Sequence, residues 1–502
     1  MSPLCIVRGG RLVDAPARRG ERRDILIDGD TIREIGAPGL AAPADATVID
    51  ATDRLLIPGL VNAHTHSHSN LSRSTGDRWP LELLLSAGPL TRGRHTHDDR
   101  YLSALLGAVE MVRKGCTACY DLYGEFPAPS IEGMTAVAQA YADVGMRAVI
   151  APMWMDVGFY AGIPGLLAAI PDDLRPAWEA AVAGPKVATE RTLDLIGTAL
   201  RGWPYDRFQV GLAVAPTVPI LCSDDLLVRL ADFARDAGIG LHTHVAESKV
   251  QAVVGLKKYG RTITAHLEKL GVLGPNFTAA HAVWVDDDDL KRLADSGSRV
   301  AHNPGSNMRL GNGIAAVRRM ADRGVEVGIG TDGRTSSDHQ NMFEAMRLAA
   351  FSARLQGPDR LRWLGADEVF AMATQGGART LGFGDAVGTI ASGAKADIVF
   401  LDAHNLNYVP LNDVTNQIVF AEDATGVASV MIGGRMIVDN GRVTTVDTSS
   451  LAFKAASAVD RLRSGVGPGA ELARKLEPVV ASFCGGLAEN PYHVHRYTGD
   501  DG

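Results

Sequence analysis

The sequence predicts an α/β protein in which a (β/α)8 barrel, the TIM-barrel architecture, is joined to a small β domain. Two observations support this fold class: eight short apolar runs alternate with helical stretches in the middle of the chain, and short strands with tight turns occur at both ends. The length of 502 residues agrees, because a barrel takes roughly 250 residues and leaves room for smaller units. A doubly wound open sheet is the alternative for the middle.

Both ends of the chain are expected to contribute strands to one β domain. The stretches rich in Ile, Leu and Val near the start are 4–13, 24–35 and 47–50. A similar texture returns near the other end at 396–402, 427–432 and 435–439. Asn440-Gly441, after the last of these, is a strong hairpin-turn signal. We therefore expect residues 1–58 and 387–450 to form a single β domain.

The middle of the chain, residues 59–386, is predicted to form the barrel, with its first strand beginning slightly earlier. The eight apolar runs interpreted as its strands are 55–63, 116–121, 147–154, 208–216, 239–245, 277–284, 299–303 and 325–331. Helical stretches between them include 98–114, 190–201, 224–237 and 286–296. The Pro- and Gly-rich connection 155–186 is predicted to be a loop. Residues 451–502 are expected to form a C-terminal tail that begins with a helix over 451–463 and ends in a polar segment.

Composition and charge exclude several classes of protein. Apolar residues make up 46% and charged residues 22%, as in ordinary globular proteins. The net charge is −8 and basic residues do not form long runs, which argues against a nucleic-acid partner. No apolar window is long enough for a membrane span, and no secretory signal is expected. Five scattered cysteines favour a reducing, cytoplasmic environment.

Histidines and acidic residues gather at the ends of the predicted strands. Those that mark the ends of the first, fifth, sixth, seventh and eighth strands are His64, His66, His242, His244, Glu247, His281, His302 and Asp332. Because the C-terminal ends of barrel strands meet at one mouth, these side chains are expected to converge there. Neutral imidazole is a common metal ligand, so the pattern indicates a metal site. His95 and His97 have the same spacing at a helix start and are predicted to be solvated surface.

These motifs resemble those of the amidohydrolase superfamily, from Gly9 to about Asp447. The stretches that carry the resemblance are 57–66, His244 with Glu247, Ala280-His281, 302–307 and 330–333. They are most similar to the branch that holds chlorohydrolases of s-triazines and deaminases of guanine, cytosine and adenosine derivatives. The resemblance implies a (β/α)8 barrel with a small β-sandwich built from both chain ends. It also implies a homo-oligomer, for which a dimer is our expectation.

One divalent metal ion is implied by the resemblance. Its ligands in this chain would be His64, His66, His244 and Asp332. Three nitrogens and one carboxylate oxygen suit zinc, with iron(II) as a substitute. Two-metal relatives bridge their ions with a carboxylated lysine after the fourth strand, whereas this strand ends at Val214-Ala215-Pro216. A single ion is therefore favoured.

The resemblance implies a hydrolytic deaminase of an amino-substituted N-heterocycle of purine, pyrimidine, pterin or triazine type. Zinc lowers the pKa of a bound water to about 7, and the resulting hydroxide attacks the ring carbon. The candidate catalytic residues are Glu247, His281 and Asp332. Glu247 would protonate a ring nitrogen, His281 would help to take the proton of the water, and Asp332 would shuttle a proton.

Contacts to this small heterocyclic substrate are predicted from residues near the barrel mouth, namely His68, Trp79, Glu82, His302 and Asn303. His302 either contacts the substrate or holds its loop. His242 lies one layer deeper than His244 and is predicted to be a hydrogen-bonded core residue. Adenosine-type deaminases of this branch usually carry a histidine just after the fourth strand, where this chain has Thr217. That departure argues against an adenosine-like substrate.

Two other functions stay open at this point. The first is hydrolysis of a different bond on the same metal, either the C–Cl bond of a triazine or the C–N bond of an amide, urea or carbamate. Glu247 favours deamination without deciding between these reactions. The other function is a non-catalytic scaffold. This alternative is remote, because such scaffolds lose metal ligands and this chain keeps them.

Overall fold

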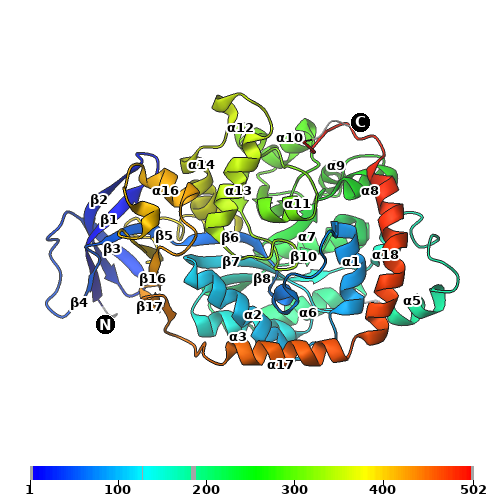
Figure 1. Cartoon of the computed structure of the whole chain (residues 1–502), viewed down its shortest axis with the longest axis horizontal. Helices are drawn as coiled ribbons and strands as arrows, with labels where there is room; N and C mark the ends of the chain where they lie inside the picture. Colours follow the sequence, from blue (N-terminus) through cyan, green and yellow to red (C-terminus); the bar gives the residue numbers. More distant parts are fainter. Residues whose placement is uncertain (1–3, 127, 183–187, 499–502) are drawn as a thin grey trace.

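The computed structural model describes residues 4–126, 128–182 and 188–498. A closed barrel forms the body of the molecule, and a β sheet made from both chain ends lies at one side (Figure 1). The predicted fold class, a (β/α)8 barrel with a small β domain from the chain ends, is confirmed. The predicted units also include residues 1–3, 127, 183–187 and 499–502, which lie outside the described residues.

The barrel strands run parallel and close on themselves. They are β6 (Leu60–Thr65), β7 (Cys116–Tyr123), β8 (Arg147–Trp154), β9 (Val210–Leu212), β10 (Ala215–Pro216), β11 (Leu241–Val245), β12 (Phe277–His281), β13 (Arg299–His302) and β14 (Glu326–Ile329). Pairing runs in the orders β10-β8-β7-β6, with β9 beside β8, and β11-β12-β13-β14. Val214 pairs with Leu241 at one seam, and the amide of Asp332 donates to the carbonyl of His64 over 2.9 Å at the other. All strands therefore end at one mouth.

Helices surround these strands. They are α1 (Leu81–Thr91), α2 (His97–Arg113), α3 (Ile131–Val144), α6 (Thr189–Arg201), α7 (Asp224–Ala237), α8 (Lys249–Tyr259), α9 (Ile263–Lys269), α10 (Asp287–Asp295), α11 (Pro304–Arg309), α12 (Val317–Asp322), α13 (Met342–Arg354), α14 (Ala366–Ala371) and α15 (Gly377–Thr380). The predicted loop at 155–186 instead contains α4 (Phe159–Gly162) and α5 (Arg175–Val182), and its residues 183–186 lie outside the described residues. Pro176 does not prevent α5, because proline is tolerated in the first turn of a helix.

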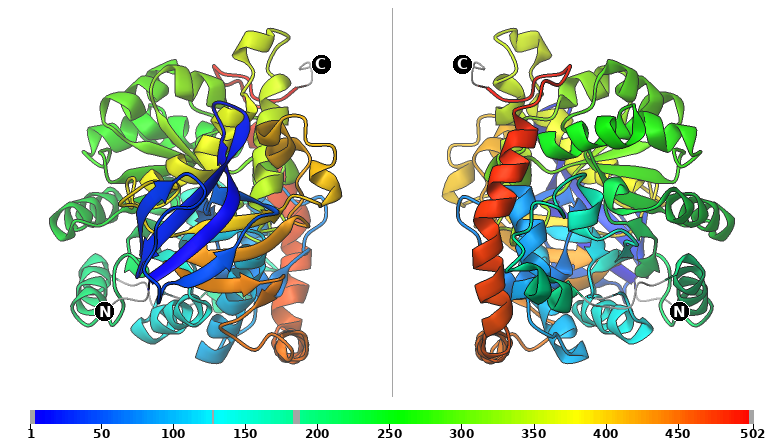
Figure 2. Two further views of the ribbon diagram at one scale, coloured as in Figure 1. Left: turned by 90° about the vertical axis from the view of Figure 1, so that its left-hand side faces the viewer. Right: turned by 90° about the vertical axis from the view of Figure 1, so that its right-hand side faces the viewer.

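The sheet beside the barrel unites the two ends of the chain. Its strands are β1 (Leu4–Asp14), β2 (Arg19–Asp28), β3 (Thr31–Gly36), β4 (Thr47–Asp50), β5 (Arg54–Pro58), β15 (Ile398–Asp402), β16 (Val427–Ile432), β17 (Arg435–Asp439) and β18 (Arg442–Val443). They form one sheet of nine strands in the order β18-β17-β16-β15-β5-β1-β2-β3, with β4 beside β1. The left view of Figure 2 shows blue strands from the start of the chain next to orange strands from near its end. Helix α16 (Val414–Phe420) lies between β15 and β16 in the chain. Asn440 and Gly441 have φ of 46° and 75°, as the hairpin between β17 and β18 requires.

The predicted strand 55–63 is divided between the two sheets. Residues up to Pro58 belong to β5 and pair with β15, whereas residues from Leu60 belong to β6 in the barrel. Gly59 lies at the crossing, where a Cβ atom would be only 2.1 Å from Thr117 Oγ1, so a larger residue does not fit. The apolar run continues across this glycine because each strand is buried in a different core.

A buried ion pair joins the barrel to the sheet from the chain ends. Arg147 at the start of β8 contacts Asp397, the residue before β15, through Nε–Oδ2 and Nη2–Oδ1 distances of 2.8 and 3.0 Å. Both side chains are buried, and the amide of Gly433 also donates to Asp397. The carboxylate of Asp397 therefore accepts hydrogen bonds from both the buried arginine and one loop amide.

Asp397→Ala is expected to lower the free energy of unfolding by about 3–5 kcal/mol, because it would leave Arg147 buried without its partner. Denaturant unfolding of the purified protein measures this loss. The matched control is Asp385→Ala, which removes an exposed contact with Arg379 and should cost less than about 1 kcal/mol. Equal, small losses in the two variants would contradict the structural role of the buried pair.

The C-terminal segment departs most from the sequence-based expectation. The predicted helix over 451–463 is present as α17 (Leu451–Ser464), but the supposed polar tail contains α18 (Gly467–Ala488), a helix of 22 residues. Helix α18 packs against α1 and α8 along the right-hand edge of Figure 1. Leu472, Leu476 and Val480 are buried on one face of it, at helical spacing. Among the described residues, none of the helices combines the length and apolar character needed to cross a bilayer.

Candidate functional site

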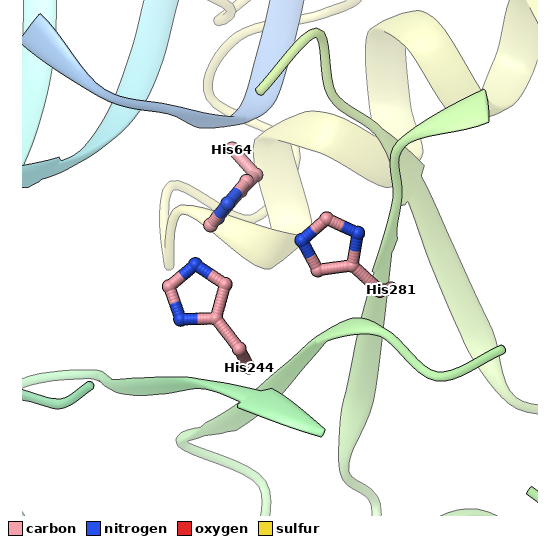
Figure 3. Close-up of side chains that lie close together, drawn as sticks. All are labelled: His64, His244 and His281. Carbon is pink, nitrogen blue, oxygen red and sulfur yellow. The ribbon is translucent and has the colours of Figure 1, made fainter. Parts of the chain in front are cut away.

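The structure brings five of the predicted site residues together at the barrel mouth. His64 belongs to β6 and His66 is the residue directly after it, His244 belongs to β11 and His281 to β12, and Asp332 follows β14. Figure 3 shows the rings of His64, His244 and His281 projecting toward one another. Their candidate ligand atoms lie within 4.8 Å of one another, and the same limit holds for the set of His64, His66 and Asp332.

The chain leaves two of these strands through left-handed residues. His281 has φ of 67° and Asp332 has φ of 61°, which is uncommon for residues other than glycine. Strand β12 therefore ends at His281 rather than at the predicted position 284. Backbone strain of this kind clusters at functional sites, where the surrounding structure holds it.

Backbone carbonyl groups orient two of the imidazoles. Nδ1 of His66 donates to the carbonyl oxygen of Leu122 over 2.7 Å, and Nδ1 of His244 donates to that of Thr217 over 2.6 Å. Because a carbonyl only accepts, the proton lies on Nδ1 and Nε2 keeps its lone pair. Carbonyl partners of this kind are common behind metal-binding histidines, since they fix both the tautomer and the ring orientation.

The lone pairs converge on one point. Nε2 of His66 is 3.2 Å from Nε2 of His244 and 3.1 Å from Asp332 Oδ1, and Nε2 of His64 is 3.6 Å from the same carboxylate oxygen. Two nitrogen lone pairs at this distance repel each other unless a proton or a metal ion lies between them. In the described part of the chain, neither ring nitrogen of His64 has a hydrogen-bond partner. Three nitrogens and one carboxylate oxygen fit a divalent metal ion.

Burial and charge keep most of this cluster in the protonation states that bind a metal. Burial lowers the pKa of His64 to about 3 and that of His244 well below its usual value, so both rings are neutral at pH 7. Burial opposes ionisation of Asp332, but its contacts with His64 and His66 lower its pKa well below the usual range. Burial alone would lower the pKa of His66. The contact with Asp332 outweighs this effect, so the pKa of His66 is raised. A metal ion would compete with the proton of His66 for the ring nitrogen.

Glu247 is a buried carboxyl group beside this cluster. It lies two residues beyond β11, and its Oε1 is 3.7 Å from Nε2 of His281. The amide nitrogen Nδ2 of Asn312 donates to Oε1 over 3.1 Å. Burial raises the pKa of Glu247 well above its usual value, and the charges of Asp332 and Glu82 raise it further. A carboxylic acid that keeps its proton near neutral pH can act as a general acid.

His281 links the acid to the metal cluster. Its Nδ1 donates to Oδ1 of Asn307 over 2.9 Å, and its Nε2 is 3.8 Å from Asp332 Oδ2. Burial lowers the pKa of His281, so its ring is neutral and Nε2 is a free base. The site therefore combines a neutral base with a protonated acid beside a set of metal ligands.

The residues predicted to contact substrate occupy different positions. Glu82 on α1 is buried, accepts a hydrogen bond from Ser248 over 2.6 Å and lines a cavity beside Glu247. Nδ1 of His68 accepts a hydrogen bond from the amide of Gly124 over 2.9 Å. The ring proton of His68 therefore lies on Nε2, where it can be donated to another group. Trp79 is half-buried and lies against Gly76, where a Cβ atom would be 2.4 Å from the indole.

His302 and Asn303 are buried at the end of β13. In the described part of the chain, neither ring nitrogen of His302 and neither amide atom of Asn303 has a hydrogen-bond partner. His242 corrects the prediction made for it: the ring is buried in the core but is not hydrogen-bonded to any described residue. Instead it packs against the ring of Tyr120 at a centroid distance of 4.6 Å.

Sequence reasoning missed several groups that shape this site. Asn307 lies within the quoted stretch 302–307 and was available as a candidate from that motif. Asn312, by contrast, lies in a glycine-rich loop without any pattern, and its contact with Glu247 depends on the tertiary fold. Helix α18, five residues of which line the cavity beside Glu82, was hidden by Pro478 and Gly485-Gly486.

A closed barrel that gathers histidines and carboxylates at the ends of its strands defines the class of metal-dependent barrel hydrolases. Comparison with known proteins makes the assignment specific. The profile of the amidohydrolase family matches residues 55–437. The chain belongs to the amidohydrolase family.

Two relatives that are similar over most of the chain are named as deaminases. The chain is 34% identical over 445 residues to the 5′-deoxyadenosine deaminase of Methanothermobacter thermautotrophicus, which covers 88% of this chain and 95% of that protein. It is 31% identical over 446 residues to the 5-methylthioadenosine/S-adenosylhomocysteine deaminase of Caldanaerobacter subterraneus subsp. tengcongensis, with coverage of 88% and 94%. The predicted reaction class, hydrolytic deamination of an amino-substituted N-heterocycle, is confirmed.

Solved structures share the fold, and some of them contain zinc. An adenosine deaminase from Xanthomonas campestris with bound zinc superposes with a TM-score of 0.78 at 26% identity, covering 92% of this chain and 99% of that one. The atrazine chlorohydrolase of Arthrobacter aurescens complexed with zinc gives a TM-score of 0.78 at 26% identity, with coverage of 91% and 100%. Both of these structural relatives therefore contain bound zinc, which supports a metal ion in this chain.

Proposed function

We propose that this chain is a zinc-dependent hydrolase that deaminates adenine nucleosides whose 5′ carbon carries hydrogen or a thioether. Water replaces the amino group of the purine, which gives ammonia and the corresponding inosine derivative. The names of the two deaminase relatives support this substrate class. The single observation that carries the reaction type is the buried carboxyl group of Glu247, 3.7 Å from His281 and beside the candidate metal ligands.

The candidate ligands of the metal are His64, His66, His244 and Asp332. Their donor set suits zinc, and iron(II) suits the same donors. When bound, the metal lowers the pKa of a water ligand to about 7 and so supplies a nucleophile at neutral pH. The strand end at β10 has no lysine, which supports a single ion.

The chain's own residues move the protons. Protonated Glu247 donates to a ring nitrogen of the base as the carbon that bears the amino group becomes tetrahedral. Nε2 of neutral His281 accepts a proton from the attacking water, and Asp332 Oδ2 is a second acceptor 3.8 Å away. The amino group leaves as ammonia once it has received a proton from this pair, and the second proton of the water returns to Glu247 as the carbon–oxygen bond becomes a carbonyl group.

Glu82 is the candidate for binding the sugar. A buried carboxylate can accept hydrogen bonds from two neighbouring hydroxyl groups, as the diol of a ribose would offer. The histidine that adenosine-type relatives usually carry after the fourth strand is Thr217 here, and its backbone carbonyl orients His244. The names of the deaminase relatives support an adenosine-type substrate despite this departure. The base would then be held through Glu247 instead.

Ammonia release from a panel of substrates tests the proposal. Zinc-loaded protein is assayed with 5′-deoxyadenosine, 5′-methylthioadenosine, adenosine, guanine, cytosine and an aminopterin ring. The expected result is ammonia from the adenine nucleosides, with a larger kcat/KM than from any free base. Ammonia from another ring alone would keep the reaction and overturn the substrate class.

Hydrolysis of a triazine C–Cl bond is the second candidate, because the atrazine chlorohydrolase shares the fold at a TM-score of 0.78. The same zinc-loaded protein is assayed with atrazine for chloride release. Chloride without ammonia from any nucleoside would favour this candidate over deamination.

Asn312→Ala is expected to lower kcat by about fivefold to tenfold, because it removes one hydrogen bond that orients the Glu247 carboxyl group. Zinc content should stay at one ion per chain, since Asn312 lies outside the candidate ligands. The matched control is Asn276→Ala, which removes an amide donated to the carbonyl of Ile239 at the start of β11 and β12, far from the mouth. If both variants lose kcat equally, Asn312 does not position the acid.

The homodimer and the cytoplasmic location expected from the sequence belong to this proposal as well. Size-exclusion chromatography with light scattering tests the first, and the cell fraction that contains the native protein tests the second.

A further inference from the structure

A cavity of about 130 Å³ lies between the barrel mouth and the C-terminal helix α18. Its floor carries Glu82, Ser248 and Asn312, and its roof is formed by one face of α18, including Val480, Ala481 and Cys484. A cavity that holds one water needs only about 10–15 Å³, so a substituent of several heavy atoms fits here. The cavity is therefore large enough to be part of the substrate site.

The polar floor connects this cavity to the catalytic acid. Asn312 lines it and donates to Glu247 over 3.1 Å, and Ser248 lines it and donates to Glu82 over 2.6 Å. A nucleoside whose base meets Glu247 and whose sugar hydroxyls meet Glu82 would therefore direct its remaining substituent toward α18.

The roof is apolar and uncharged. The residues of α18 that face the cavity are Val480, Ala481, Cys484, Gly485 and Ala488. Leu83 on α1 and Leu310 complete this apolar wall. Lys249 also lines the cavity, but its ammonium group lies over the ring of Trp284, 5.8 Å from the centroid. A charged group that reached the roof would lose its water without gaining a charged partner from α18.

The tail after α18 holds this arrangement in place. Arg496 donates through Nε to the carbonyl of Val283 over 2.8 Å, and its own carbonyl accepts the amide of Ile314 over 2.8 Å. Trp284 donates to the carbonyl of Asn312 over 2.7 Å, so the tail and the loop that holds Asn312 are fastened together. The C-terminal segment is thus built into the wall of the site.

We propose that this cavity under α18 is the subsite for the 5′ substituent of the nucleoside and that it selects an uncharged alkylthio group over a zwitterionic amino-acid tail. The inference rests on the proposed function, which assigns an adenine nucleoside to the site. The C-terminal helix is then a specificity element rather than a passive extension.

Two substrate series test the subsite in the zinc-loaded full-length enzyme. The first extends 5′-methylthioadenosine to the propylthio compound, and kcat/KM is expected to rise about tenfold because two further methylenes are buried. The second compares a butylthio compound with S-adenosylhomocysteine, and the charged tail is expected to react at least tenfold less efficiently. If kcat/KM does not rise from the methylthio to the propylthio compound, or if S-adenosylhomocysteine reacts as efficiently as the butylthio compound, the proposed subsite is wrong.

Variants of α18 connect this selectivity to the roof. Val480→Phe fills the cavity and should reduce the propylthio-to-methylthio ratio to about one. Val480→Thr keeps the shape of the side chain but makes the roof polar, and it should reduce the propylthio-to-methylthio ratio severalfold. This second variant tests the subsite even if Val480→Phe impairs folding. Ser482→Phe, on the exposed face of the same helix, is the matched control and should keep the wild-type ratio.

The outcomes separate this inference from the proposed function. Absence of ammonia from every adenine nucleoside overturns both. If the enzyme deaminates adenine nucleosides but both Val480 variants keep the wild-type propylthio-to-methylthio ratio, only the proposed subsite is wrong.

Discussion

Glu247→Gln is expected to lower kcat for ammonia release by about 10²–10⁴-fold, which is the usual contribution of a general acid. Glutamine has the size of glutamic acid, and its amide can still pair with Asn312, but it has no proton to give to a ring nitrogen. The metal content should not change, because Glu247 lies outside the candidate ligands. Steady-state kinetics and metal analysis on the same preparation measure both quantities.

Glu82→Gln is the matched control for this prediction. It makes the same carboxyl-to-amide change on another buried side chain of the site, but we propose that Glu82 binds the sugar. The expected result is a rise in KM with a smaller effect on kcat, since binding to the sugar is similar in the ground and transition states. Full turnover by Glu247→Gln would remove Glu247 from the mechanism.

The barrel, and the gathering of candidate metal ligands at its mouth, could be predicted from the sequence for one physical reason. Parallel strands buried on both faces are continuous apolar runs, and their carboxyl ends meet at one mouth. Histidines at those ends therefore come together without further information, as His64, His244 and His281 do in Figure 3.

The misses also have physical causes. The run 55–63 could not be divided from its hydrophobicity, because β5 and β6 are both buried, and only the crossing at Gly59 separates them. Helix α18 contains Pro478, which lowers its apparent helical propensity, yet the burial of one face against α1 and α8 compensates. Asn312 reaches Glu247 across 65 positions of the chain, a contact without a local signal.

His66→Ala is the second prediction with a large expected effect, since metal and activity should be lost together. Nε2 of His66 lies 3.1–3.2 Å from both Asp332 and His244, so its removal opens the centre of the proposed ligand set. The remaining two nitrogens and one oxygen bind zinc less tightly, and kcat should fall at least about 10³-fold with the nucleophile that the metal supplies. Elemental analysis after dialysis measures the ion, and ammonia release measures activity.

His97→Ala is the matched control, because His95 and His97 repeat the His-x-His spacing of His64 and His66 but His97 is exposed at the start of α2. That variant should keep one zinc ion per chain and wild-type turnover. The comparison also distinguishes a lost ligand from a damaged fold: in His66→Ala, added zinc at high concentration should restore part of the activity if the barrel is intact. Wild-type zinc content in His66→Ala would show that the ion binds elsewhere, and the proposed ligand set would then be wrong.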